Sequence, residues 1–216
     1  MVLVEKVSKK LAAQIAGILS LDRDREEVIA YGALNLLHTS LSTILLILFG
    51  ILTKSLLEIL VISLTSALLR QYSGGAHATS PNRCAISSVI LFGGLSQIVK
   101  YIIIFDNIQQ ILIYQVITLV FILYILYRYA PADNPSKRIT NREMRDKLRI
   151  ASFRFVLFLA ILTVILWGLY LKFESIKTLQ SIVCIHIGLV WQALSITVIG
   201  HSFIKAMDTF LIKIKI

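Results

Sequence analysis

The sequence is short of the charged residues that a soluble protein needs at its surface. Of its 216 residues only 16% are charged, whereas 57% are hydrophobic. Soluble chains are about 25% charged on average, so a soluble domain of this length could not bury so much apolar surface. The apolar runs are also long and continuous, whereas the strands of an outer-membrane barrel alternate apolar and polar residues. The composition therefore predicts an all-α fold, with residues 1–216 forming a single polytopic membrane domain.

Cysteine is almost as scarce, and two residues, Cys84 and Cys184, provide no disulfide framework. Cys184 lies inside an apolar run, where a cysteine normally packs as a small hydrophobic side chain. Cys84 instead follows a polar segment that also contains His77. A zinc site is disfavoured there, because two ligands fall short of the usual three or four and no third Cys, His or carboxylate is close in sequence.

Six apolar segments approach the roughly 20 residues that a helix needs to cross a bilayer. They run from Val28 to Leu52, Ser55 to Leu69, Ala85 to Ile104, Ile108 to Tyr127, Phe155 to Leu171 and Leu179 to Phe203. The stretches Leu11 to Leu19 and Phe203 to Ile216 are amphipathic and are expected to lie at the membrane interface. We expect six transmembrane helices preceded by an interfacial N-terminal helix.

Acidic residues are few, and the basic residues are distributed unevenly. The chain has 22 Lys and Arg against 12 Asp and Glu, and all the basic residues except Lys54, Lys100, Lys172 and Lys177 fall in alternate polar segments. Basic loops stay in the cytoplasm, so both termini and the segment from His77 to Cys84 are expected to face it.

The net charge of +10 also indicates attraction to anionic membrane lipids. Nucleic acid is a poor candidate partner, because no basic module interleaved with aromatic residues is present. The segment from Arg128 to Arg154 is basic enough to favour a second interpretation, in which it binds an acidic peptide. The residues expected to dock such a peptide are Lys137, Arg138, Arg142 and Arg145.

Polar residues inside the spans call for a separate explanation. Asn35, His38, His186 and Gln192 are expected to form hydrogen bonds between helices, although ionisable groups in a membrane are also functional candidates. Glu58 follows Lys54 by four residues and is expected to pair with it.

The polar segment from Arg70 to Cys84 has the features of a helix start that carries a reactive thiol. Ser80 is a good N-cap and Pro81 fits the first helical position, which places Cys84 in the first turn. The positive end of the helix dipole there favours an anionic sulfur, and the cations Arg83 and Arg70 act in the same direction.

His77 can act on this thiol if the chain bends sharply, which Gly74 and Gly75 permit. A neutral imidazole would accept the thiol proton and the imidazolium would return it to a leaving amine. Backbone amides near the two glycines, or the side chains of Gln71 and Asn82, could bind the oxyanion. The spacing alone leaves a purely structural role for His77 and Cys84 open.

Two motifs give the sequence a family resemblance. The run Arg70-Gln71-Tyr72-Ser73-Gly74-Gly75-Ala76-His77 followed by Arg83-Cys84, and the later run from Tyr129 to Arg138, resemble the signatures of the accessory gene regulator B (AgrB) family. The resemblance extends over the chain length, the number of spans and the order of the motifs.

The resemblance implies a cysteine endopeptidase in the cell membrane of a Gram-positive bacterium, with Cys84 and His77 as catalytic residues, and Arg70 and Gly75 match the Arg and the second Gly of the family motif. The implied partner is an AgrD-type quorum-sensing propeptide, whose acidic tail is removed and whose core is closed into a thiolactone or lactone. No metal or organic cofactor is implied. The resemblance also implies a homodimer, a state that the sequence itself does not show.

Two other functions remain possible from the residues alone. A transporter of peptides or small molecules would also have six spans, although no internal repeat and no pair of interrupted spans supports it. A scaffold or sensor without catalysis would not need the Cys84 thiol.

Overall fold

The computed structural model describes residues 2–76, 78–101, 108–133 and 140–214. These residues form eight α-helices and no strand, which confirms the predicted all-α class. The helices are α1 (Val2–Leu19), α2 (Arg23–Leu52), α3 (Leu56–Ser73), α4 (Pro81–Tyr101), α5 (Ile108–Tyr129), α6 (Arg142–Phe173), α7 (Ile176–Ser195) and α8 (Val198–Lys213).

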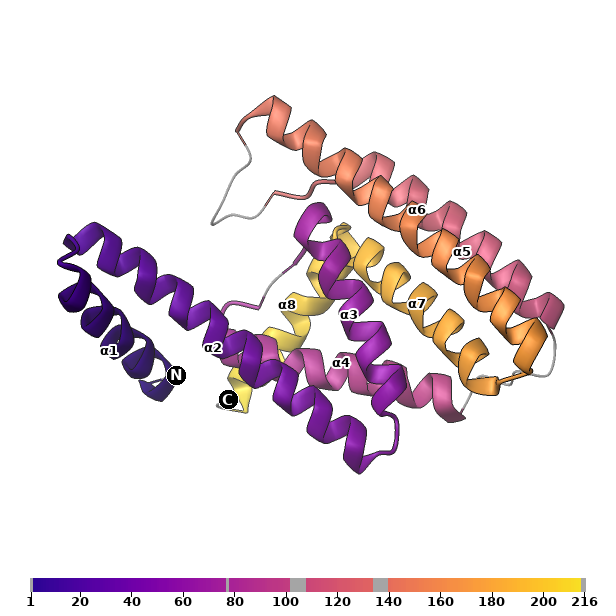
Figure 1. The fold of residues 1–216 in the computed structure, drawn as a ribbon, viewed down its shortest axis with the longest axis horizontal. Helices are drawn as coiled ribbons and strands as arrows, with labels where there is room; N and C mark the ends of the chain where they lie inside the picture. The colour runs from indigo at the N-terminus through magenta and orange to yellow at the C-terminus, as the bar shows by residue number, and fades with distance from the viewer. Residues whose placement is uncertain (1, 77, 102–107, 134–139, 215–216) are drawn as a thin grey trace.

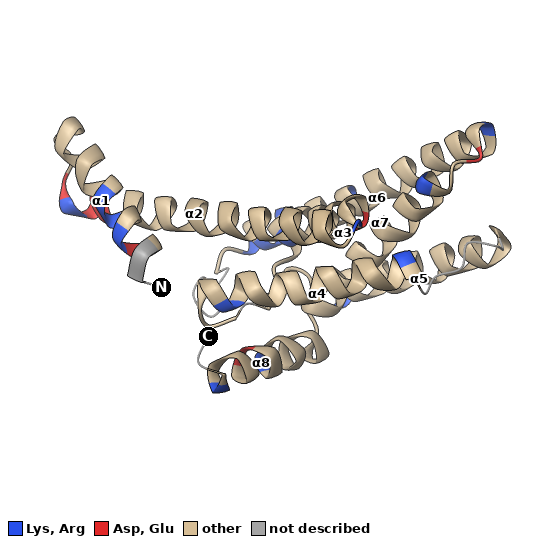
Figure 2. Ribbon diagram, turned by 90° about the horizontal axis from the view of Figure 1, so that it is seen from below, with Lys and Arg blue, Asp and Glu red and all other residues tan. Residues whose placement is uncertain are grey.

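Six of these helices, α2 to α7, are long and apolar enough to cross a membrane. The predicted number of spans is therefore confirmed, and the chain is a multi-pass membrane protein. Charged residues gather on α1 and near helix ends, while the long middle of α2 carries none in the view of Figure 2. The end of the predicted third span, residues 102–104, lies outside the described residues.

The predicted last span, Leu179 to Phe203, is wrong in its extent. Helix α7 ends at Ser195, and α8 begins at Val198 after a break at Ile196 and Thr197. Thr197 has extended backbone angles, and its hydroxyl accepts a hydrogen bond from the Gly200 amide, so it caps α8. The turn is so tight that a Cβ on Gly200 would meet the Ser195 Cα at 2.5 Å. A polar cap inside a continuous apolar run thus divides one predicted helix into two.

Helices α3 and α7 form the centre of the bundle, with α5 and α6 side by side on one flank and α2 and α4 on the other (Figure 1). The backbones of α3 and α7 approach closely at Gly188 of α7, where an added Cβ would lie 2.6 Å from the Ile62 carbonyl oxygen of α3. Small residues at helix contacts permit such close packing in membranes. Side chains of the pair also bond, since the Ser66 hydroxyl donates to Gln192 Oε1 at 3.3 Å.

The N-terminal helix α1 packs against α2, away from the rest of the bundle (Figure 1). Its buried stripe consists of small residues at four-residue spacing, Ser8, Ala12 and Ala16. Its lysines Lys9 and Lys10 are exposed, as expected of an amphipathic helix.

The polar residues within the spans meet the sequence-based expectations only in part. His186 bonds to another helix, with 2.7 Å between its Nδ1 and the Thr118 hydroxyl. The Nδ1 of His38, by contrast, is buried without a hydrogen-bond partner among the described residues. Glu58 is buried, but no ion pair joins it to Lys54 in the described part of the chain.

Candidate active site

Helix α4 begins as the sequence predicts. Pro81 is its first residue, and the Cys84 amide donates to the Ser80 carbonyl oxygen at 2.9 Å. Cys84 therefore lies in the first turn, where its half-buried side chain is close to the positive end of the helix dipole. Cys184 is also a free thiol, but it is fully buried in the core within α7, as predicted.

The loop before α4 leaves α3 through two glycines in backbone conformations that other residues rarely adopt. Gly74 has φ of +73° and Gly75 has φ of +143°. A Cβ on Gly74 would collide with the Ala132 carbonyl oxygen, and one on Gly75 would lie 2.8 Å from the Ser195 hydroxyl. Both glycines are therefore required by close neighbours as well as by backbone angle.

The neighbours of the glycines come from two distant parts of the chain. The Ala132 amide donates to the Ser73 carbonyl oxygen at 2.9 Å, so the segment after α5 is bonded directly to the last residue of α3. From α7, Gln192 Nε2 donates to the Gly74 carbonyl oxygen at 2.7 Å and to the Ser73 hydroxyl at 2.9 Å. The two sequence motifs, separated by about a quarter of the chain, thus meet in space.

Gln192 and Ser195 were not predicted as part of the site. The Ser195 carbonyl oxygen accepts from the Ala76 amide at 3.2 Å, which fixes the loop on the far side of the glycines. The amide of Gly74 donates to the Arg70 carbonyl oxygen as the C-cap of α3. It is therefore not free to serve as an oxyanion donor, whereas no such bond occupies the Gly75 amide among the described residues.

Arg70 supplies a positive charge at the cavity that contains the thiol. Arg70 and Cys84 line the same small cavity, so a cationic side chain and the thiol share one site. One guanidinium nitrogen donates to the Ala76 carbonyl oxygen, but Nε is buried and has no partner among the described residues. The other lining residues are Ala76, Ala78, Ser87, Ser88, Leu91, Phe92, Trp191 and Ile204.

The cavity beside Cys84 has a volume of about 30 Å³, and a bound water needs about 10–15 Å³ measured in this way. It can therefore hold one or two waters but no peptide segment. The hydroxyl of Ser87 lines it without a hydrogen-bond partner in the described part of the chain, and Asn82 Oδ1 is likewise buried and unpartnered. Two residues that line the cavity with the thiol, Arg70 and Ser87, thus carry an unpaired polar atom, which is unusual for a purely structural position.

The sequence predicts that the positive charge of Arg83 favours an anionic sulfur, but Arg83 forms an ion pair with Asp208. Its Nε lies 2.7 Å from Asp208 Oδ1 on α8, so a carboxylate balances its charge. Burial acts to raise the pKa of Asp208, but hydrogen bonds from Thr79 and Arg83 outweigh that effect and hold the pKa below its ordinary value. Asp208 was not predicted, although it is the single acidic residue in an otherwise apolar and basic helix.

Several predicted site residues cannot be compared with the geometry. His77, Lys137 and Arg138 lie outside the described residues. Gln71 is exposed at the end of α3. No group of three or more His, Cys, Asp and Glu able to hold a metal occurs among the residues that the structure describes.

Most of the described residues in the basic segment from Arg128 to Arg154 are helical. Helix α6 starts at Arg142 and spans 32 residues, more than a bilayer requires, so its basic first turns extend beyond the apolar part. Arg142 is exposed, whereas Arg145 lies 2.6 Å from Asp133 and is already paired.

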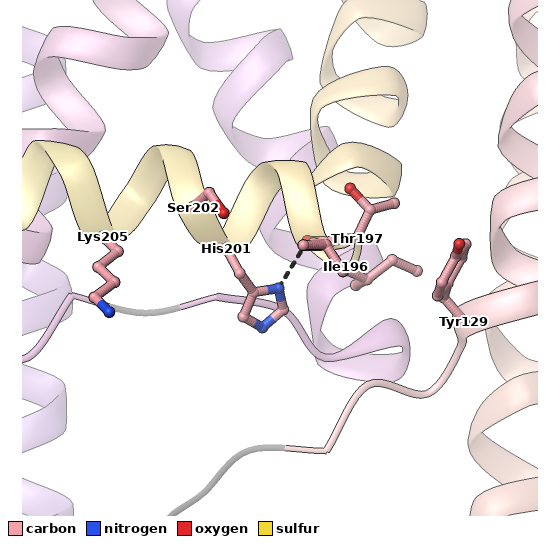
Figure 3. A pocket seen from close by; sticks show the side chains of 7 residues that line it. Tyr129, Ile196, Thr197, His201, Ser202 and Lys205 are labelled. Atoms are coloured by element: carbon pink, nitrogen blue, oxygen red, sulfur yellow. Dashed lines mark hydrogen bonds between the residues drawn. The ribbon is translucent and has the colours of Figure 1, made fainter.

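A second, open groove of about 320 Å³ lies where α7 meets α8, with Tyr129 of α5 across from it (Figure 3). His201 extends from α8 into this groove, and its Nδ1 lies 2.9 Å from the Thr197 carbonyl oxygen. Lys205 lines the same groove one turn further along α8. This surface is distinct from the cavity that holds the thiol.

Comparison with known proteins assigns the chain to a family. Residues 5–196 match the family described as Accessory gene regulator B. The chain is 30% identical over 212 residues to a "Putative AgrB-like protein" of Clostridium perfringens (strain SM101), with 96% of this chain and 98% of that protein aligned. A Listeria innocua protein of the same name is 32% identical over 163 residues, covering 74% of this chain and 71% of its own. No solved structure matches. Because the family match covers all six spans and both motifs, the chain belongs to the AgrB family.

Proposed function

We propose that this chain is a membrane cysteine endopeptidase that removes the acidic C-terminal tail of a quorum-sensing propeptide and promotes ring closure of the remaining peptide. Membership of the AgrB family supports a role in the processing of such a peptide. The observation that carries the enzymatic part is the thiol of Cys84, which lies in the first turn of α4 and shares a cavity with Arg70.

In the proposed first step, the imidazole of His77 accepts the Cys84 proton and the sulfur attacks the scissile carbonyl carbon. The carbon–nitrogen bond then breaks, and the imidazolium returns the proton to the amine of the departing tail. The core peptide is left as a thioester on Cys84. Arg70 favours the thiolate by its charge, and its unpaired Nε–H supports an additional role as an oxyanion donor.

In the second step, a thiol of the bound peptide loses its proton to the imidazole and attacks the thioester carbon. The bond to Cys84 breaks, its sulfur regains the proton, and a thiolactone is released; a peptide hydroxyl would give a lactone in the same way. Ring closure outcompetes hydrolysis only if water is scarce and the peptide thiol is held close. The apolar side chains beside the thiol, Leu91, Phe92 and Ile204, are consistent with scarce water at this site.

The substrate would reach the site along the membrane surface. The charge distribution favours a cytoplasmic active site, in the plasma membrane of a Gram-positive bacterium. The exposed Arg142, together with Lys137 and Arg138, is the best candidate to bind the acidic tail, and Arg145 contributes less because Asp133 already pairs with it. Dimer formation and contact with anionic lipids are compatible with this proposal.

The direct test is co-expression with a propeptide encoded beside the gene, followed by mass spectrometry of the products. Cys84→Ala should abolish release of the tail, whereas Cys184→Ala should retain it, because Cys184 is buried in the core away from the site. A Cys84→Ser variant is expected to accumulate uncleaved propeptide. Normal processing by Cys84→Ala would refute the proposed function, and a transporter would then be the remaining alternative.

A further inference from the structure

One buried carboxylate connects α8 to the start of α4. Asp208 is only 5% exposed, and both of its oxygens are used. Oδ1 accepts from Arg83 Nε at 2.7 Å, and Oδ2 accepts from the Thr79 hydroxyl at 2.6 Å and from the Thr79 amide at 3.3 Å. The partners are 125 and 129 residues away in the chain, so these contacts depend entirely on tertiary structure.

The three side chains form a closed set. Besides contacting Asp208, Arg83 donates to the Thr79 hydroxyl at 2.7 Å. Thr79 lies in the loop that precedes α4, and Arg83 is the residue immediately before Cys84. The carboxylate therefore holds the chain on both sides of the helix start, and the direction of the first turn follows from it. We name Thr79, Arg83 and Asp208 the α8 clamp.

The same face of α8 also covers the thiol. Ile204 lies one helical turn before Asp208 and lines the cavity that contains Cys84. Next to it, the ring of Phe203 meets Trp191 edge-on, with 5.6 Å between ring centroids, and Trp191 is another wall of that cavity. An apolar cover beside a charged anchor limits access of water to the sulfur.

We infer that α8 is part of the active site and that Asp208 is a positioning residue, which acts on Cys84 through Thr79 and Arg83. The family match ends at residue 196, before α8 begins, so this role is argued from the contacts of Asp208 and not from that match. The inference rests on the proposed function, since it assumes that the Cys84 thiol is the nucleophile. A buried ion pair is often no more stabilising than well-packed apolar residues of similar volume. Fold stability alone therefore does not explain a carboxylate at this position.

The experiment compares Asp208→Asn with Thr209→Ala, a neighbouring exposed position of α8 outside the clamp. Propeptide cleavage by the full-length protein in membranes is measured against peptide concentration. Asp208→Asn should lower kcat between about 10-fold and 10²-fold, because a small displacement of a catalytic group has effects of this size. Its KM should change less than twofold, and Thr209→Ala should behave as the unaltered protein. Asp208→Glu, which keeps the charge, should recover part of the loss.

A labelling measurement separates this role from a general loss of structure. With a neutral alkylating reagent, Asp208→Asn should speed modification of Cys84, since Ile204 no longer covers it, while the core residue Cys184 stays protected. Equal exposure of both thiols would mean that Asp208 only stabilises the fold, and the inference would be wrong. Unchanged kcat in Asp208→Asn would also overturn it, while inactivity of Cys84→Ala would leave the proposed function intact. Activity in Cys84→Ala would instead refute the function itself.

Discussion

At the scale of single residues, the site depends on positions where a side chain is excluded or a polar atom is left unpaired. Gly74 and Gly75 are enclosed by Ala132 and Ser195, so the loop toward Cys84 fits only without a Cβ. Arg70 Nε is the opposite case, a buried donor without a partner in the described part of the chain. Such an atom costs free energy in the resting protein, which is acceptable if a substrate oxygen later binds it.

Gly75→Ala tests the close fit of the loop. The new Cβ would meet the Ser195 hydroxyl at 2.8 Å with φ at +143°, a strained conformation that costs about 1–3 kcal/mol. The loop should move and propeptide cleavage should fall at least about tenfold. The matched control is Gly94→Ala on α4, where an added Cβ meets nothing within 4 Å. Equal activity of the two variants would show that the fit at Gly75 is unimportant.

The ionisation of Asp208 sets a pH dependence whose sign can be stated. Because its pKa is lowered in the folded protein, the carboxylate contributes stability that is present above the ordinary pKa of about 3.9 and is lost as pH falls through the folded-state value. The difference in thermal unfolding temperature between the unaltered protein and Asp208→Asn should therefore stay constant from about pH 5 to 8. It should shrink below about pH 4, and a difference that varies around neutral pH would contradict the assignment.

At the scale of helices, local sequence signals predict some boundaries, and tertiary contacts determine the others. The start of α4 was predictable, because Ser80 and Pro81 are a local cap and the first-turn position of Cys84 follows from them. The break between α7 and α8 was not, because Thr197 is one polar residue in an apolar run without proline. The roles of Gln192, Ser195 and Asp208 depend on residues over a hundred positions away, which no local pattern reveals.

Gln192 allows the contribution of α7 to the site to be measured. The side chain is fully buried, and Gln192→Leu would leave the Ser73 hydroxyl and the Gly74 carbonyl oxygen without this donor. We expect a loss of about 1–3 kcal/mol in stability and slower cleavage, because buried polar groups left unpaired are costly. Thermal unfolding in detergent checks the first effect. Gln180→Leu, at the opposite end of the same helix, should change neither quantity appreciably.

At the scale of the whole molecule, hydrophobicity was enough to predict the all-α class and the six spans. Six apolar helices and an amphipathic α1 follow from segment length and composition alone. The charge distribution predicts the orientation, because nearly all Lys and Arg lie on one set of alternate segments. The way in which α3, α4, α7 and α8 meet around Cys84 could not be predicted from composition, since it depends on packing between distant helices.

The orientation can be tested with single cysteines in a background that lacks Cys84 and Cys184. Glu174→Cys, at the exposed turn between α6 and α7, should react with a membrane-impermeant reagent in intact cells. Ser20→Cys, between α1 and α2, should react only after the cells are permeabilised. The opposite pattern would place both basic termini outside the cell and remove access for a cytoplasmic propeptide.

The position of α8 in the chain has a consequence for biosynthesis. All six spans precede it, so a ribosome completes α2 to α7 before Asp208 is even made. During that interval Cys84 is already in place, but Thr79 and Arg83 have no carboxylate to hold them. Under the proposed function, the nascent protein therefore carries its thiol in an unassembled site, and cleavage would begin only after α8 has docked on the finished bundle.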